Sequence, residues 1–260
     1  MPPVRIAAFA LLGLIFGSFL TVVIHRVPRG ESTVRPRSRC PRCGAEIRAV
    51  DNVPVVSYLF LGGRCRNCKS RVSPEYPLTE AATAALFVAA AAVHQDLFVA
   101  VLVALFLAVM VAIALIDARW RIVPNRIVYP SLVIGLVAIV AGQVVAGGVD
   151  AVRGLIGLAV YAGPLFLVAL AVPHGMGMGD VKLAALIGLV LGSLGLSYVA
   201  VAAGVGIVAG GLGAVLALAI LRLSRKQQIP FGPFLAGGAV VAALAAPEIS
   251  RLYLSLLGTV

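Results

Sequence analysis

The sequence LFVAVLVALFLAVMVAIALI, from Leu97 to Ile116, is an unbroken run of 20 apolar residues, and Asp117 follows it directly. A helix needs roughly 20 such residues to cross the hydrocarbon core of a bilayer. Similar runs recur near residues 4–24, 78–93, 127–146, 154–172, 181–196, 198–221 and 232–247. The composition, with 61% hydrophobic and 12% charged residues and a mean hydropathy of +1.07, lies far outside that of soluble globular domains. We therefore predict an all-α polytopic membrane protein with about eight transmembrane helices.

The longest apolar stretch should contain two of these helices. It has 41 residues, from Val181 to Leu221, which is too long for one span, and we predict a turn near residues 192–197. Glycines spaced four residues apart let helix backbones approach closely. We expect three such pairs to be packing surfaces: Gly13 with Gly17, Gly188 with Gly192, and Gly206 with Gly210.

The formal net charge of +11 could indicate an anionic partner such as nucleic acid, but the positions of the basic residues favour another explanation. If residues 28–74 are cytoplasmic and the spans alternate, the cytoplasmic loops hold 18 of the 21 lysines and arginines; only Arg5, Arg153 and Arg251 lie outside. This asymmetry follows the positive-inside rule. We expect a multi-pass membrane protein with no nucleic-acid partner. The first apolar run is long for a signal peptide, so we expect a retained anchor with its N-terminus outside.

All four cysteines lie in the first loop, as Cys40-Pro-Arg-Cys43 and Cys65-Arg-Asn-Cys68 with 21 residues between the pairs. Two such pairs at this separation match a tetrahedral zinc site with four thiolate ligands. The alternative is a pair of disulfides, which are rare in the reducing cytoplasm. A loop of about 50 residues is also too small to fold without a staple. The sequence therefore predicts a structural zinc ion.

Two aspartates stand at the ends of predicted spans. Asp117 closes one run, and Asp180 ends the sequence Gly175-Met176-Gly177-Met178-Gly179-Asp180. Counting spans from a cytoplasmic first loop places both at the same cytoplasmic face, where ionisable groups usually mark a functional site. A carboxylate that draws a proton from water, beside a protonated one that donates, is the chemistry of aspartic peptidases.

Each aspartate also has a structural interpretation. Asp180 could cap a helix that begins at Val181, and Asp117 could face headgroup water beside Arg119 and Arg121. If both are catalytic, the helix termini favour Asp180 as the base and Asp117 as the initially protonated acid.

Four further residues are candidates for supporting the active site. Gly177 and Gly179 would let the backbone pass close to the reacting groups. Lys182 and the nearby Arg119 carry positive charges that could reverse the roles of the two aspartates as acid and base. Glu80 is either a snorkelling surface acid or a polar member of the active region.

The ordered motifs resemble those of the type IV prepilin leader peptidases, which are GxGD-type membrane aspartic peptidases. The resemblance covers nearly the whole chain and rests on these stretches: Gly17-Ser18-Phe19-Leu20, Val22-Val23-Ile24 and Arg26; Arg39 to Gly44; Asp51-Asn52-Val53-Pro54; Ser57-Tyr58-Leu59; Gly63 to Arg66; Tyr76-Pro77-Leu78 with Glu80; Asp117 with Pro124; Gly177 to Leu183; and Pro230-Phe231-Gly232-Pro233-Phe234. Thr21, His25 and Asn125 depart from residues common in the family.

The resemblance implies an endopeptidase of the bacterial inner membrane that removes the basic leader of prepilins and pseudopilins after a glycine, at the cytoplasmic face, with Asp117 and Asp180 as catalytic residues. It also implies N-methylation of the new first residue, usually Phe, by S-adenosylmethionine in a function tied to the cysteine-bearing loop. The expected domains are a first membrane helix (1–25), a cytoplasmic tetracysteine zinc domain (26–76) and a membrane aspartic peptidase domain (77–260). The expected partners are precursor proteins and membrane lipids.

Two other functions compete with this one. A transporter could use Asp117 and Asp180 to relay protons or bind a cation, and a nonenzymatic assembly factor could dock through the zinc loop. The soluble loop has no glycine-rich nucleotide fingerprint. The sequence therefore places no pocket for S-adenosylmethionine, and it names neither the appendage served nor the oligomeric state.

Overall fold

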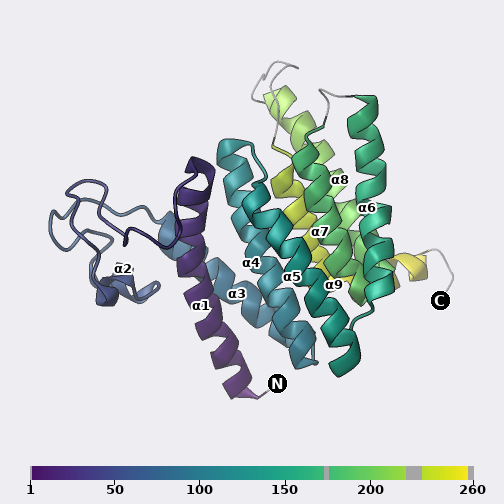
Figure 1. The fold of residues 1–260 in the computed structure, drawn as a ribbon, viewed down its shortest axis with the longest axis horizontal. Coiled ribbons are helices and arrows are strands. Elements are labelled where there is room, and N and C mark those ends of the chain that lie inside the picture. Colours follow the sequence, from purple (N-terminus) through teal and green to yellow (C-terminus); the bar gives the residue numbers. More distant parts are fainter. Residues whose placement is uncertain (1, 173–175, 221–229, 257–260) are drawn as a thin grey trace. The chain divides into compact units, whose positions relative to one another are not determined.

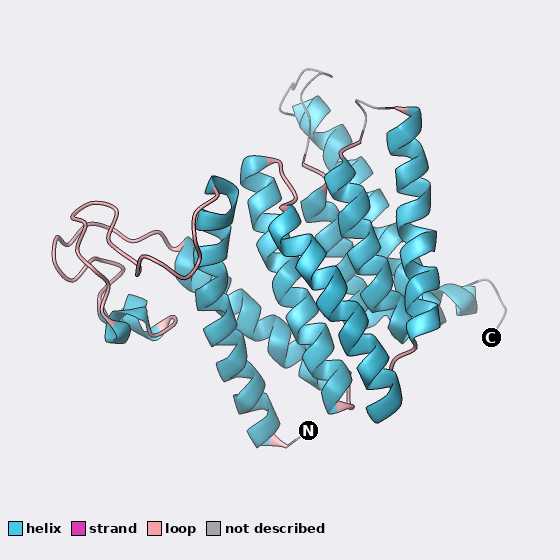
Figure 2. Cartoon of the chain, in the orientation of Figure 1, coloured by secondary structure: helices cyan, strands magenta, loops and turns pink. Residues whose placement is uncertain are grey.

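The computed structural model describes residues 2–172, 176–220 and 230–256 (Figure 1). Its chain divides into two compact units, unit 1 (Met1–Ala92) and unit 2 (Val93–Val260). The regular structure of the described residues is helical, with two isolated antiparallel bridges and no strand (Figure 2). The predicted all-α class is therefore confirmed. Five residues on which the predictions relied lie outside the described ranges: Gly175, the apolar Leu221, and the basic residues Arg222, Arg225 and Lys226.

Unit 1 consists of two long helices joined by a largely irregular loop. Its elements are α1 (Pro3–Arg26), the 3-10 turns η1 (Val27–Arg29) and η2 (Ala49–Asn52), α2 (Val56–Phe60) and α3 (Glu75–Val93). The predicted packing role of Gly13 and Gly17 is confirmed. A Cβ on Gly13 would lie 2.5 Å from the Cα of Ala84, and one on Gly17 would lie 2.7 Å from the Cα of Glu80. The small glycines thus let α1 and α3 meet backbone to backbone.

The described residues of unit 2 form a bundle of six helices: α4 (Leu97–Trp120), α5 (Asn125–Val145), α6 (Ala151–Ala171), α7 (Met178–Leu194), α8 (Leu196–Ile220) and α9 (Gly232–Leu256). Helix α7 is the centre of the bundle, since it packs against α5, α6, α8 and α9. Its glycines meet α6 directly, because a Cβ on Gly192 would lie 2.9 Å from the Cα of Gly157. The turn predicted in the longest apolar stretch is confirmed at Gly195, between α7 and α8.

Seven of the described helices are long and apolar enough to cross a membrane, and the chain is a multi-pass membrane protein. They are α1, α3, α4, α5, α6, α8 and α9. The remaining predicted span corresponds to α7, which has 17 residues and is shorter than the roughly 20 that a span requires. The count of eight spans therefore stays a prediction.

Successive helices of unit 2 alternate in direction, as Figure 1 shows. The C-terminal end of α4 and the N-terminal ends of α7 and α9 consequently lie at the same end of the bundle, at the top of the view. Each of these three helix ends carries a residue of the candidate site.

Candidate active site and metal centre

Asp117 lies in the last turn of α4 and is buried, with 4% of its surface exposed. Its Oδ2 accepts a hydrogen bond of 2.9 Å from the backbone amide of Gly232, at the start of α9. A carboxylate held in this way does not face headgroup water, so that structural interpretation is wrong. The hydrogen bond joins residues 115 positions apart in the sequence and fixes the orientation of the side chain.

The structure adds Gly232 to the candidate site, and reasoning from the aspartates alone did not single it out. A Cβ at this position would lie 2.7 Å from Oδ2 and 3.1 Å from Cβ of Asp117. Only glycine lets the amide approach the carboxylate this closely. The local signal was the proline that follows, because proline favours the first turn of a helix and so places the Gly232 amide at a helix N-terminus.

Asp180 is the third residue of α7, and the N-cap is Gly177. The interpretation of Asp180 as an N-cap is therefore wrong, although it does lie in the first turn. Its carboxylate interacts with the backbone amide of Gly177. It also lies close enough to Asp117 for the two carboxylates to repel each other electrostatically. The structure thus brings the two aspartates together at one end of unit 2.

The two glycines before Asp180 differ in what surrounds them. A Cβ on Gly179 would lie 2.9 Å from the Cβ of Val123, in the segment that follows α4. Close packing at Gly179 therefore holds the start of α7 against the chain that leaves Asp117. A Cβ on Gly177 would meet only ordinary contacts, the nearest being Oδ2 of Asp180 at 3.7 Å.

Lys182 is directed toward α5. Its Nζ donates a hydrogen bond of 3.0 Å to Oδ1 of Asn125 and lies 5.2 Å from the centre of the Tyr129 ring. These contacts tie the first turns of α7 and α5 together. Lys182 thus supports the position of the helix that carries Asp180.

Glu80 belongs to unit 1, whereas both aspartates belong to unit 2. Its side chain is buried, with 7% exposed, and Oε2 accepts a hydrogen bond of 2.8 Å from the backbone amide of Val55. The alternative of a snorkelling surface acid is therefore wrong.

The four cysteines of unit 1 form one cluster of free thiols. Their sulfur atoms all lie within 4.8 Å of one another, and the Sγ atoms of Cys40 and Cys68 are 3.8 Å apart. Four sulfurs bound tetrahedrally at about 2.3 Å from one zinc ion would be about 3.8 Å apart. The arrangement fits a metal ion held by Cys40, Cys43, Cys65 and Cys68, and no disulfide joins these residues.

The cysteine pairs stand on two similar turns, which we call the first knuckle (39–46) and the second knuckle (64–71). The amide of Cys40 donates to Ala45, and that of Cys65 donates to Ser70, both at 2.9 Å. An isolated antiparallel bridge closes each knuckle. Backbone amides of the first knuckle lower the pKa of the Cys40 thiol to about 6, whereas at Cys43 the effect of the Ala45 amide is outweighed by the neighbouring thiols and burial, and the pKa rises to about 11.

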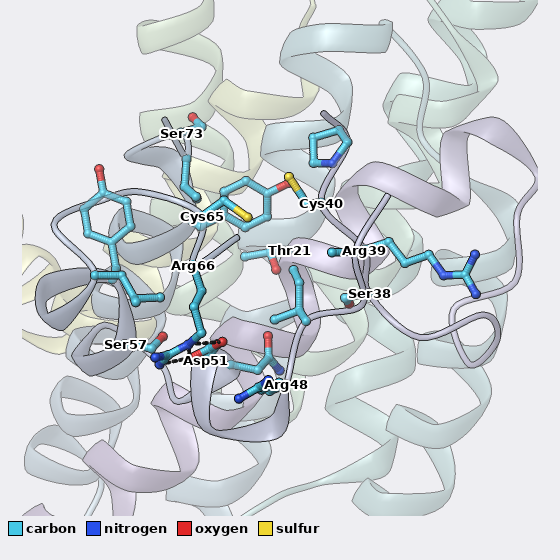
Figure 3. A pocket seen from close by; sticks show the side chains of 18 of the residues that line it. Thr21, Ser38, Arg39, Cys40, Arg48, Asp51, Ser57, Cys65, Arg66 and Ser73 are labelled. Atoms are coloured by element: carbon cyan, nitrogen blue, oxygen red, sulfur yellow. Dashed lines mark hydrogen bonds and ion pairs between the residues drawn. The ribbon is translucent and has the colours of Figure 1, made fainter. Parts of the chain in front are cut away.

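A pocket with a volume of about 720 Å³ lies between α1, the two knuckles, α2 and the start of α3. In Figure 3, Cys40 and Cys65 lie at its upper edge and an ion pair between Arg66 and Asp51 lies at its lower edge. This pair is bidentate, with hydrogen bonds of 2.5 and 2.9 Å, and it holds the pKa of Asp51 below its usual value. Thr21 lies between the two edges.

Comparison with known proteins gives the same division of the chain. Residues 104–246, which contain both aspartates and Gly232, match the type IV leader peptidase family. The chain belongs to the type IV leader peptidase family. Residues 11–94, with Glu80 and the cysteines, match the bacterial peptidase A24 N-terminal domain.

Curated relatives are similar to this leader peptidase over nearly their full length. The Pseudomonas aeruginosa protein named prepilin leader peptidase/N-methyltransferase is 36% identical to this chain, over 95% of this chain and 93% of the relative. The next two relatives have the same name. The relative in Bacillus subtilis shares 35% identity over 95% and 96%, and that in Dichelobacter nodosus shares 32% over 96% and 95%. No solved structure is significantly similar to the chain. None of these relatives supports the transporter alternative.

Proposed function

We propose that this protein is an aspartic endopeptidase of prepilins and pseudopilins that also methylates the N-terminus it exposes. The observation that carries the peptidase function is the buried Asp117, held by the Gly232 amide at the same end of unit 2 as Asp180. The names of the relatives, prepilin leader peptidase/N-methyltransferase, support both activities.

Asp180 acts as the base in this mechanism. It takes a proton from water as the water oxygen attacks the carbonyl carbon of the leader's last residue, a glycine. Asp180 lies in the first turn of α7, where the helix dipole stabilises the ionised carboxylate required of a base.

Asp117 acts as the acid. The Gly232 amide donates to Oδ2, so Oδ2 is the carbonyl-type oxygen of a protonated Asp117 and Oδ1 carries the proton. That proton passes to the leaving amine as the tetrahedral intermediate breaks down. The products are the free leader and a mature protein with a new amino terminus, and the proton gained by Asp180 returns the pair to its starting charge.

Unit 1 serves the second activity. We propose that Cys40, Cys43, Cys65 and Cys68 hold a structural zinc ion, because their shell leaves no position open for a substrate. S-adenosylmethionine supplies the methyl group, which moves from its sulfonium sulfur to the amine nitrogen, with S-adenosylhomocysteine and a proton as the other products.

The proposed location is the bacterial inner membrane, with the zinc loop and the active site at the cytoplasmic face. The excess of basic residues assigned to cytoplasmic loops supports this orientation. The macromolecular partners are prepilin and pseudopilin precursors, and membrane lipids surround the apolar helices.

Incubation of the purified protein in detergent with a prepilin and methyl-labelled S-adenosylmethionine tests both activities in one tube. We expect a shortened substrate that carries the label. An intact leader after incubation with the wild-type protein would refute the peptidase function. Cleavage without label would refute only the methyltransferase function.

A further inference from the structure

The pocket of unit 1 has the size of a small-molecule site. Its volume of about 720 Å³ falls within the range of roughly 300–1,000 Å³ that is usual for ligand pockets. All the residues that line it lie between Ser18 and Glu80. None of them belongs to the unit that holds the two aspartates.

Glu80 gives this pocket a buried carboxyl group. Its side chain lines the cavity, and its contacts are with the Val55 amide and the Ser18 hydroxyl. Among the described residues, no ion pair neutralises Glu80. A buried carboxylate is costly unless a positive charge compensates it. The pocket therefore favours a ligand with a cationic group beside Glu80.

A strained turn fixes the orientation of Glu80. Val55 has a φ of +60°, and the amide of Val56 donates to the carbonyl of Pro54, which makes a γ-turn. A β-branched residue rarely adopts this conformation. The turn directs the Val55 amide at Oε2 of Glu80, so the carboxyl group is held in place where it lines the cavity.

The rest of the lining suits a ligand with a planar ring, hydroxyls and a carboxylate. The rings of His25 and Tyr76 are stacked with their centres 5.4 Å apart, and Tyr58 lines the same cavity. Aromatic faces of this kind stack on heterocycles and attract cations. Further arginines line the pocket and can bind a carboxylate: Arg39, Arg48, Arg64 and Arg71.

We propose that this pocket binds S-adenosylmethionine, with the sulfonium group beside Glu80, the adenine against the aromatic side chains and the carboxylate toward the arginines. This placement rests on the proposed methyltransferase function. The phosphate of an anionic lipid would also meet the arginines, but it would bring a second negative charge to a buried carboxylate.

The proposal gives the four-cysteine metal site a role in ligand binding. Cys40 and Cys65 both line the pocket, and residues of both knuckles form its walls. A metal ion that joins the knuckles therefore holds two walls in place. Removal of the metal should abolish binding of S-adenosylmethionine, because each knuckle is too short to keep its position alone.

The test compares ligands that differ in charge at the position of the sulfur. Isothermal titration of the purified full-length protein measures the Kd of S-adenosylmethionine, of sinefungin (with an ammonium in place of the sulfonium) and of S-adenosylhomocysteine (neutral at sulfur). In Glu80→Gln, the amide oxygen can still accept the Val55 hydrogen bond. We expect Kd to rise about tenfold or more for the two cationic ligands and less than about threefold for S-adenosylhomocysteine.

Glu75→Gln is the matched control, since Glu75 lies on the same helix but does not line the pocket. An equal change for all three ligands in Glu80→Gln, or no change, would overturn the placement of the sulfonium. Binding of short-chain phosphatidylglycerol without binding of S-adenosylmethionine would replace the proposed ligand by a lipid headgroup.

Photolabelling of the wild-type protein with 8-azido-S-adenosylmethionine gives a second measurement that needs no variant. Labelled peptides should fall between residues 18 and 80, and label confined to unit 2 would refute the site. Cleavage of a prepilin is measured on the same preparations. Active peptidase without binding of S-adenosylmethionine would overturn this inference and the methyltransferase function but leave the peptidase function standing.

Discussion

Replacement of Gly232 by alanine should disable the peptidase through Asp117. The added Cβ would lie 2.7 Å from Oδ2 and 3.0 Å from Cγ of Asp117, well below the 3.5 Å or so at which nonbonded heavy atoms attract each other. The carboxylate must therefore move by about 0.5–1 Å, and the 2.9 Å hydrogen bond from the amide is lost or distorted.

The expected loss follows from that hydrogen bond. Asp117 becomes negatively charged as it gives its proton to the leaving amine, and a hydrogen bond to a charged group contributes about 1.5–3 kcal/mol, which corresponds to about 10- to 150-fold in rate. Because the bond positions a reacting group, the loss should fall on kcat with little change in KM. The assay follows cleavage of a purified prepilin in detergent at several substrate concentrations.

Gly237→Ala is the matched control, since it lies on the same helix and no atom lies within 4 Å of the position of its Cβ. Gly237→Ala should retain wild-type kinetics. Thermal unfolding and binding of S-adenosylmethionine should be unchanged in both variants. A kcat for Gly232→Ala within about twofold of the wild type would refute the idea that this amide orients Asp117.

Three other predictions concern the two aspartates and the four-cysteine metal site. Asp117→Asn and Asp180→Asn should each lower prepilin cleavage by about 1,000-fold or more while both still methylate a precleaved substrate; substantial cleavage by Asp117→Asn alone would contradict the shared-proton mechanism. Elemental analysis should find one zinc ion per chain, and a strong chelator should lower the unfolding temperature in far-UV circular dichroism; metal-free protein of unchanged stability would count against a structural ion. Gly44 (φ +71°) and Lys69 (φ +58°) occupy equivalent positions in the knuckles, so Gly44→Lys should cost only about 1 kcal/mol, seen as about fivefold weaker zinc binding in a chelator competition; complete loss of zinc would show that the knuckles are not equivalent.

The helices were predictable because their signal is local. A membrane span is recognised from the length of one apolar run, and the runs at residues 97–116 and 127–146 correspond closely to α4 and α5. The number of spans was harder to predict at α7, because this helix has only 17 residues and packs against α5, α6, α8 and α9. Burial inside a bundle and burial in lipid both select apolar residues, and the sequence does not distinguish them.

The cysteine cluster was predictable for the same reason, since each pair lies within one short turn. The environment of Glu80 was not, because Val55, whose amide binds it, is 25 positions away. The pocket around Glu80 was equally hidden, because it combines α1, two knuckles and α3, and no single stretch carries its pattern.

The sequence by itself determined that two carboxylates stand at the ends of apolar helices and that four thiols have the spacing of a metal site. These are properties of chain length and short motifs. Only the tertiary structure decided that the Gly232 amide binds Asp117 from 115 positions away and that Gly179 packs on Val123. Such contacts depend on how whole helices pack, and packing brings together residues whose sequence neighbours give no sign of the partner.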